Sequence, residues 1–356
     1  MEKRLLNPGF WHSKRVLITG HTGFKGSWLS LWLQMLEADV TGFALPPDPD
    51  QSLFVQAKVA NGMDSIVGDV CDPEHVQAVV AQARPQIVFH MAAQSLVRES
   101  YLRPAETFRT NVQGTINVLE AIRQVEGAFL VNVTSDKCYQ NVGSSSGYRE
   151  DAPLGGSDPY SNSKACAELV TASYRESFFE GSRVATARAG NVIGSCDWAT
   201  DRLIPDLIRA AQNGKTAPIR YPDAVRPWQH VLDCLSGYLS LAEALLEDVG
   251  VASAWNFGPR AGEGRSVSWI CDAVTRRWPG DLSWEVEAGN HPPEARLLQL
   301  DSSKADKDLG WRPRLGLEEA IDWTVEGYVS AADAGALRRV LEKQLDTYMS
   351  MDEVNE

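Results

Sequence analysis

The sequence predicts an α/β fold, with a doubly wound parallel sheet and a smaller, mostly C-terminal cap domain. Short β-branched apolar runs alternate with longer helical patterns over the first half of the 356 residues. A glycine-rich turn directly follows the first of these runs, and the alternation becomes irregular beyond about residue 191. Because strands covered on both faces are apolar along their whole length, this alternation indicates a parallel sheet between two layers of helices.

Six strands are expected, over residues 15–19, 39–44, 65–67, 86–90, 128–133 and 183–188. Helices are expected between them, over residues 25–37, 73–83, 104–126 and 159–179. Several of these begin with proline, whose missing N–H costs least in the first turn of a helix.

The second half is predicted to be a loop-rich cap, because Gly, Pro and Trp recur there and only residues 203–213 and 233–247 have clear helical patterns. The expected domains are a dinucleotide-binding domain over 1–190, to which segments around 225–258 return, and a substrate-binding cap formed mainly by 191–356. Ligands of open α/β sheets bind beyond the carboxyl ends of the strands, so the cap should close over that edge.

The composition excludes several classes of function. Lys and Arg number 34 against 47 Asp and Glu, a formal net charge of −13, which repels nucleic acid. No uncharged apolar run approaches the roughly 20 residues of a membrane span, and residues 1–14 lack the apolar core of a secretory signal, so no membrane partner and a cytoplasmic location are expected. The six cysteines form no CxxC pair or Cys/His cluster, which predicts reduced thiols and no metal site.

The first motif is the glycine-rich turn. Gly20, Gly23 and Gly26 lie between the first strand and the next helix, where the absence of side chains lets the backbone turn tightly and approach a pyrophosphate. This arrangement is typical of a Rossmann dinucleotide-binding domain, although a strand-to-helix turn without a ligand has the same pattern. His21 is unusual in such a turn, and its bulky ring either loosens cofactor binding or points outward.

The next strands bear on the choice of dinucleotide. A carboxylate ending the second strand would bond a ribose 2′-hydroxyl, and an arginine would hold a 2′-phosphate. The segment 41–45, Thr-Gly-Phe-Ala-Leu, offers neither, and the absence of a nearby arginine favours NAD. Asp69 is a candidate to accept a bond from adenine, whereas Asp72 fits a helix N-cap that needs no cofactor.

The second motif is a Tyr/Lys pair. Tyr160 and Lys164 are four residues apart, on one face of an expected helix. A tyrosine of ordinary pKa near ~10 is a poor base at neutral pH, and a neighbouring ammonium group would stabilise its phenolate and lower that pKa. A tyrosine and a lysine four residues apart are common by chance. This pair is informative because it follows the glycine-rich turn.

The third motif is Thr134-Ser-Asp-Lys-Cys-Tyr139, directly after an apolar strand, so that its polar residues emerge at the carboxyl edge of the sheet. Ser135 is a candidate to bond a sugar hydroxyl, Asp136 to act as an acid, and Lys137 to act as a base or a cation. An ion pair and turn at a strand end is the alternative.

In order and spacing, these motifs resemble the extended short-chain dehydrogenase/reductase family, and residues 90–94 (His-Met-Ala-Ala-Gln) and 188–191 (Arg-Ala-Gly-Asn) extend the resemblance over nearly the whole chain. Within that family, residues 20–26, 135–137 and 226–230 together are similar to the branch that dehydrates CDP-D-glucose for bacterial surface polysaccharide such as O-antigen.

The resemblance implies an NAD-dependent 4,6-dehydratase, a hydro-lyase. Tyr160 would take the proton from the sugar O4 while hydride leaves C4 for NAD, and the ketone formed acidifies the C5 proton. A base would then remove that proton, an acid would protonate the departing C6 hydroxyl, and the hydride would return to C6 as C5 regains a proton. The product would be CDP-4-dehydro-6-deoxy-D-glucose.

Lys137 departs from the pattern of related dTDP-sugar and GDP-sugar dehydratases, which carry Asp-Glu after the same strand. At an ordinary pKa near ~10.4, less than about one lysine in a thousand is neutral at pH 7. Burial and the nearby Lys164 would depress the pKa of Lys137, and Asp136 would oppose that shift. If Lys137 stays charged, it would instead stabilise the C4 enolate, and the base at C5 is left open.

The resemblance also implies which residues form the site. The catalytic candidates are Ser135, Asp136, Lys137, Tyr160 and Lys164. The candidates for cofactor binding are Gly20, Thr22, Gly23, Phe24, Lys25, Gly26, Asp69, Val70, Ala92, Ala93, Thr134, Tyr160 and Lys164. The candidates for substrate binding are Gln94, Ser95, Asn191, Arg202, Arg226 and Arg296. Arginine meets phosphate oxygens bidentately, and exposure or a structural ion pair is the alternative for each arginine.

The helices over 104–126 and 159–179 have apolar residues on more than one face, and in this family the corresponding helices form a four-helix interface. A symmetric homodimer is therefore expected. Three other functions are weighed against the dehydratase: a nucleotide-sugar 4-epimerase, a dehydratase for another nucleotide hexose, and a non-catalytic dinucleotide sensor. Asp136 and Lys137 favour dehydration, because epimerisation needs no acid and base for C5 and C6.

Overall fold

The computed structural model describes residues 6–144, 146–179, 182–247, 249–260, 262–289 and 298–351. Its centre is a seven-stranded sheet in which every neighbouring pair is parallel. The strand order is β11-β6-β5-β4-β1-β2-β3. The chain order reverses between β1 and β4, and this switch point is where a doubly wound sheet binds its ligand. The predicted fold class is confirmed.

The six predicted strands are all present, with bounds within one residue of those expected. They are β1 (Arg15–Thr19), β2 (Asp39–Ala44), β3 (Asp64–Val67), β4 (Ile87–His90), β5 (Phe129–Val133) and β6 (Val184–Arg188). The seventh strand, β11 (Ala254–Asn256), pairs with β6 at the edge of the sheet.

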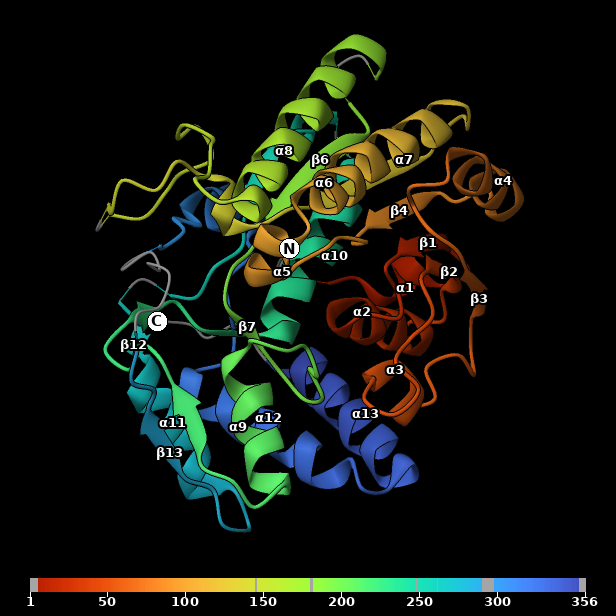
Figure 1. Ribbon diagram of the computed structural model, residues 1–356. Helices are drawn as coiled ribbons and strands as arrows, with labels where there is room; N and C mark the ends of the chain where they lie inside the picture. Colours follow the sequence, from red (N-terminus) through yellow and green to blue (C-terminus); the bar gives the residue numbers. More distant parts are fainter. Residues whose placement is uncertain are drawn as a thin grey trace.

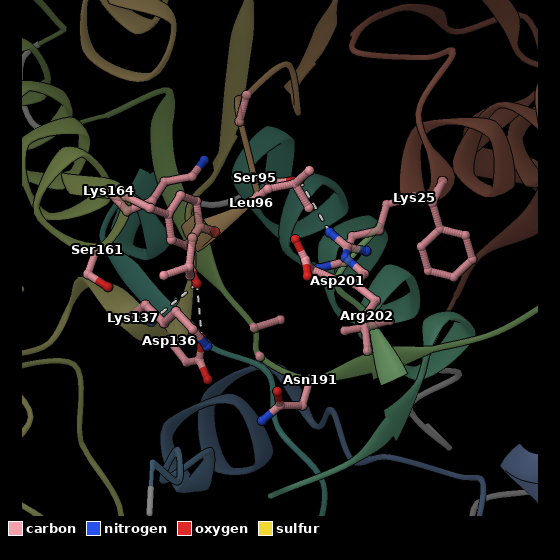
Figure 2. Close-up of a pocket in the computed structure, with 18 of the residues that line it drawn as sticks. Lys25, Ser95, Leu96, Asp136, Lys137, Ser161, Lys164, Asn191, Asp201 and Arg202 are labelled. Carbon is pink, nitrogen blue, oxygen red and sulfur yellow. Dashed lines mark hydrogen bonds and ion pairs between the residues drawn. The ribbon is translucent and has the colours of Figure 1, made fainter. Parts of the chain in front are cut away.

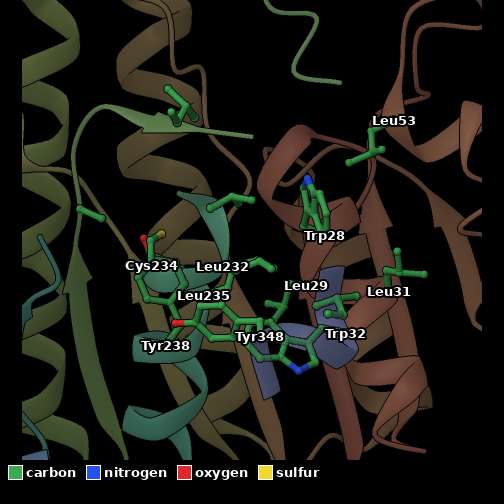
Figure 3. Close-up of a cluster of buried hydrophobic side chains, with 14 of the residues drawn as sticks. Trp28, Leu29, Leu31, Trp32, Leu53, Leu232, Cys234, Leu235, Tyr238 and Tyr348 are labelled. Atoms are coloured by element: carbon green, nitrogen blue, oxygen red, sulfur yellow. The ribbon is translucent and has the colours of Figure 1, made fainter. Parts of the chain in front are cut away.

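Side chains of the central strands alternate between two apolar layers, as the pleat requires. Leu17, Val88 and Leu130 pack on one face, against α4 (Pro73–Ala83) and α7 (Gly114–Arg123). The neighbouring strand residues belong to the core on the other face, with α2 (Phe24–Met35), α10 (Val231–Glu247) and α13 (Ala334–Ser350). Figure 3 shows Trp32 of α2 beside Tyr348 of α13, and the centroids of their rings lie 5.5 Å apart.

The expected helix over 104–126 is interrupted. It consists of α6 (Pro104–Phe108), a π-helical turn over Arg109–Gln113, and α7. Asn111, in the middle of that turn, is buried and bonds both the backbone of Gln94 and the Ser163 hydroxyl. π-helical turns inside helices are frequent at functional sites, and this one connects the loop after β4 to α8 (Pro159–Phe178).

The second half is more helical than the sequence pattern predicted. Besides α9 (Leu203–Gln212) and α10, it contains α11 (Val267–Arg277), α12 (Leu317–Ser330) and α13. The helix α13 packs against α2 and α3 (Leu53–Gln56), so the end of the chain returns to the first half (Figure 1). The expectation of a loop-rich region with only two clear helices was wrong, because apolar residues such as Leu337, Leu341 and Leu345 do repeat at helical spacing there.

The remaining elements are short. They are α1 (Pro8–Trp11), α5 (Val97–Leu102), β7 (Val192–Ile193), β8 (Ala217–Ile219), β9 (Val225–Arg226), β10 (Gln229–His230), β12 (Arg265–Ser266) and β13 (Trp284–Val286). In the described ranges no helix is long and apolar enough to span a membrane. All six cysteines are free thiols, and five of them are buried, as predicted.

Candidate active site

The glycine-rich turn joins β1 to α2, and at its glycines no side chain covers the backbone. Gly20 has φ +79°, and a Cβ there would lie 2.7 Å from the Ala92 nitrogen. A Cβ on Gly26 would lie 2.1 Å from the Gly20 carbonyl oxygen, so the helix approaches the strand as closely as only glycine allows. Gly23 is the N-cap of α2. The free N–H groups of the first turn therefore face a cavity, which fits a pyrophosphate.

His21 does not point outward, so that alternative was wrong. Its ring is fully buried, and its Nε2 lies 2.7 Å from the Ser65 hydroxyl of β3. Gly42 on β2 makes room for the ring, because a Cβ at that position would lie 2.3 Å from it. Burial lowers the pKa of His21 to about 4, so the ring is neutral at pH 7.

The end of β2 carries no charge that selects a phosphate. Ala44 and Leu45 line the cavity beside Thr22. Asp69, after β3, lines it too, and one of its carboxylate oxygens accepts a bond from the Cys71 backbone N–H at 2.9 Å. Asp72 is the N-cap of α4 and accepts from the His75 N–H at 3.1 Å, as its alternative role predicted.

Tyr160 and Lys164 lie in the first two turns of α8, which Asp158 caps at its N-terminus. Both side chains are more than nine-tenths buried and line the cavity. The Lys164 Nζ donates to the Val133 carbonyl oxygen at 3.2 Å, which joins the helix to the end of β5.

The electrostatics of this pair differ from the expectation. Burial raises the pKa of Tyr160 to about 12, and a bond with Ser135 and the charge of Arg202 oppose that rise. Burial and the charge of Lys25 lower the pKa of Lys164 to about 8. Arg202, on the cap side of the cavity, is therefore one cation that favours the Tyr160 phenolate.

The third motif forms a tight turn after β5. Ser135 caps a short 3₁₀ turn over Asp136–Cys138, and its hydroxyl donates to Asp136 Oδ1 at 3.0 Å. The Asp136 carboxylate is 1% exposed, and its Oδ2 has no hydrogen-bond partner in the described part of the chain. Such an oxygen costs free energy unless a ligand hydroxyl or water satisfies it.

Lys137 is less buried than its expected role as a base required. One third of its side chain is exposed, and its Nζ lies 3.9 Å from Asp136 Oδ1. The expected burial of Lys137 was therefore wrong, because solvent reaches its side chain and a carboxylate lies beside its Nζ.

Two candidate residues approach from the cap. Asn191 has φ +30°, and its buried Nδ2 has no acceptor among the described residues. Arg202 donates to Asp197 Oδ2 at 2.6 Å and to the Ser95 hydroxyl at 3.2 Å, which places its guanidinium across the mouth of the cavity. Figure 2 shows Asp136, Lys137 and Lys164 on one side of the pocket and Lys25 and Arg202 on the other.

One cavity of about 1420 Å³ contains these groups. Its volume exceeds the roughly 300–1,000 Å³ of a site for one small ligand, so it has room for two. The candidate residues that line it are Gly20, Thr22, Gly23, Phe24, Lys25, Gly26, Asp69, Val70, Ala92, Ala93, Ser95, Thr134, Ser135, Asp136, Lys137, Tyr160, Lys164, Asn191, Arg202 and Arg226. Among the described residues, no group of His, Cys, Asp and Glu could hold a metal ion.

Two substrate candidates are not part of this lining. Gln94 is held by the Leu96 backbone and the Thr107 hydroxyl, so its amide serves the loop after β4 and does not reach the cavity. Arg296 lies outside the described residues.

Sequence reasoning missed Asp197 and Asn111. Asp197 is 5% exposed and fixes the orientation of Arg202. Its spacing of five residues from Arg202 carried no helical or strand pattern that could have indicated the pair. Asn111 had no signal either, because it lies among other polar residues of an expected helix, Arg109, Thr110 and Gln113.

The fold and this cavity define the class of extended short-chain dehydrogenases/reductases. The chain belongs to the GDP-mannose 4,6 dehydratase family, whose model matches residues 17–324. It is 47% identical to a CDP-glucose 4,6-dehydratase of Salmonella typhimurium, and the match covers 97% of this chain and 99% of the relative.

More distant relatives share the architecture. A dTDP-glucose 4,6-dehydratase of Xanthomonas campestris is 26% identical over 88% of this chain and 93% of its own. The crystal structure of a Thermus thermophilus UDP-glucose 4-epimerase in complex with NAD superposes with a TM-score of 0.76 at 26% identity, covering 89% of this chain and 99% of that one.

Proposed function

We propose that this chain is a CDP-D-glucose 4,6-dehydratase that uses NAD and releases CDP-4-dehydro-6-deoxy-D-glucose and water. The observation that carries the proposal is the buried Ser135-Asp136-Lys137 turn beside Tyr160, in a chain similar over nearly its whole length to a CDP-glucose 4,6-dehydratase. An epimerase needs the tyrosine and the lysine of α8, whereas an acid poised for a leaving hydroxyl has a use only in dehydration.

The cradle between β1 and α2 fits the pyrophosphate of NAD, and Asp69 would accept a bond from its adenine. Bound there, NAD supplies a hydride acceptor for C4 and a hydride donor for C6. The uncharged Ala44 and Leu45 offer nothing to hold a 2′-phosphate, which favours NAD over NADP.

The protein's own residues move the protons. Tyr160 accepts the proton of the sugar O4 as a phenolate, which its bond with Ser135 and the charge of Arg202 favour. Asp136 donates a proton to the departing C6 hydroxyl, and its unpartnered Oδ2 is free to do so. Lys137 either removes the C5 proton or, as a cation, stabilises the C4 enolate.

The substrate diphosphate is assigned to the cap side of the cavity. The unpartnered Asn191 Nδ2 is a donor that needs an acceptor, and Arg202 and Arg226 add positive charge in the same cavity. The preference for cytosine rests on the similarity to the Salmonella relative alone.

A homodimer and a cytoplasmic role in deoxyhexose synthesis for surface polysaccharide, such as O-antigen, complete the proposal. Leu169 and Phe178 on α8 and Tyr101 and Leu102 on α5 expose between 49% and 77% of their surface. Exposed apolar residues on adjacent helices are typical of a subunit interface, and two copies of α7 and α8 would form a four-helix bundle. The six free thiols agree with a reducing compartment.

The decisive experiment uses CDP-glucose deuterated at C4. Dehydration moves the label to C6 and introduces a solvent proton at C5, epimerisation leaves the label at C4, and a sensor gives no product. Tyr160→Phe should abolish the first oxidation, and undiminished turnover of that variant would remove Tyr160 from its role. A panel of CDP-, dTDP-, GDP- and UDP-glucose identifies the nucleotide.

A further inference from the structure

One buried ion pair holds both ends of the turn that carries Ser135, Asp136 and Lys137. Arg188, at the end of β6, donates from Nε and Nη2 to the two carboxylate oxygens of Glu168 on α8, at 2.9 and 2.8 Å. Thr134, just before the turn, donates its hydroxyl to Glu168. Tyr139, just after the turn, accepts a bond from Arg188 Nη1 at 2.7 Å.

The pair is ionised although each of its side chains is only 3% exposed. Burial raises the pKa of Glu168, but Arg188 and the hydroxyls of Thr134 and Thr186 outweigh it and hold that pKa below its ordinary value. Burial disfavours the charge of Arg188, and Glu168 outweighs it so that the pKa of the guanidinium lies above its ordinary value. A buried pair of this kind keeps a fixed geometry, because separating the two charges in a low dielectric is costly.

Tyr139 connects the pair to the rest of the sheet. Its hydroxyl donates to Asn256 Oδ1 on β11 at 2.7 Å, and its ring lies under the Arg188 guanidinium at 4.8 Å. Asn256 in turn donates to the carbonyl oxygens of Tyr148 and Asp301. The Tyr139 hydroxyl is therefore held by Arg188 on β6 and Asn256 on β11.

The same elements hold the other reacting groups. Lys164 precedes Glu168 by one turn of α8, and Arg188 precedes Gly190 by two residues. Gly190 packs directly on the Asp136 carboxylate, since a Cβ there would lie 2.0 Å from Oδ2. The ion pair thus fixes the distance between the helix that carries Tyr160 and the turn that carries Asp136.

We propose that Tyr139 is a positioning residue for the elimination step. Through Tyr139, the Glu168–Arg188 pair keeps Asp136 and Lys137 aligned with the sugar whose O4 proton Tyr160 removes. This inference rests on the proposed function. It predicts that loosening Tyr139 slows the loss of water and leaves the oxidation at C4 almost unchanged, because Tyr160 and Lys164 belong to α8, whereas Asp136 and Lys137 belong to the turn.

The test compares Tyr139→Phe with Tyr148→Phe in single turnovers of the full chain with NAD and CDP-glucose. Tyr148 is a matched control: its ring stacks on Tyr139 at 5.3 Å, and among the described residues its hydroxyl bonds the loop at Asn141, Val142 and Ser144. In Tyr139→Phe we expect reduced nicotinamide to form at the wild-type rate and to decay about ten-fold more slowly, since a bond to a charged group is lost. We also expect faster amide hydrogen exchange over residues 134–139 without any ligand.

The outcomes separate the two proposals. If the wild-type chain makes no product from CDP-glucose, the proposed function fails. If the wild type turns over but Tyr139→Phe shows wild-type decay and wild-type amide exchange, the positioning role is overturned. The rates of oxidation and of decay could instead both fall in proportion to the folded fraction, as measured by circular dichroism. Tyr139 would then serve only the stability of the fold, and the positioning role would also be overturned.

Discussion

Gly190→Ala should disable the acid of the proposed reaction without replacing any reacting group. Gly190 has no left-handed backbone angle, so an alanine there is not strained by itself. Its Cβ would lie 2.0 Å from Asp136 Oδ2 and 2.4 Å from Cγ. Ordinary contacts are near ~3.5 Å, so the carboxylate must move by about 1.5 Å. A misplacement of about 1 Å costs on the order of 100-fold in rate, or about 2.7 kcal/mol in the activation free energy.

The assay is the single turnover described above, with CDP-glucose and NAD. We expect reduced nicotinamide to form within about two-fold of the wild-type rate and then to persist about 100-fold longer, because protonation of the C6 hydroxyl is impaired. Gly316→Ala is the control, because nothing lies within 4 Å of a Cβ at that N-cap of α12. A folded Gly190→Ala enzyme with wild-type decay would refute the assignment of Asp136 as the acid.

Three further predictions concern other parts of the molecule. Lys137→Ala should stall after oxidation and retain reduced cofactor, and normal exchange of the C5 proton with solvent would show that another group is the base. His230 is fully buried, and burial lowers its pKa to about 3. Below the ordinary histidine pKa of about 6.5, the unfolded chain therefore binds a proton that the folded chain does not. The free energy of unfolding then falls as the pH drops, by up to ~1.4 kcal/mol per pH unit. Urea unfolding of His230→Phe at about pH 7 and about pH 5 should show a smaller loss than wild type, and an equal loss would contradict a neutral buried ring. Leu169→Glu should shift the proposed dimer to monomer in light scattering, whereas Val329→Glu, at another exposed apolar position, on α12, should not. A Leu169→Glu dimer would exclude α8 from the interface.

The strands and the first helices were predictable because their signals are local. The apolar runs before residue 190 match β1 to β6, and prolines mark the starts of α4 and α8. The helix α13 was also encoded, in the spacing of Leu337, Leu341, Leu345 and Tyr348, but its polar majority obscured the pattern. The π-helical turn at Asn111 was not predictable, because it follows from bonds to the distant Gln94 and Ser163.

The sequence predicted which residues line the candidate site better than it predicted the electrostatics of those residues. Residue type and the position after a strand placed Ser135, Asp136 and Lys137 at the cavity. The charge of Arg202 near Tyr160 and the exposed third of the Lys137 side chain each depend on how segments far apart in the chain pack together. A sequence pattern does not carry those distances.

The sequence by itself determined the parallel sheet, the bare glycine turn and the residues that gather at the carboxyl edge, since each depends on neighbours within a few positions. Only the tertiary structure decided that His21 is buried against Ser65, that Gln94 serves its own loop, and that a Glu168–Arg188 pair holds the Asp136 turn. These features are contacts between segments far apart in the chain, and their free energies depend on burial and distance, which exist only after the chain has folded.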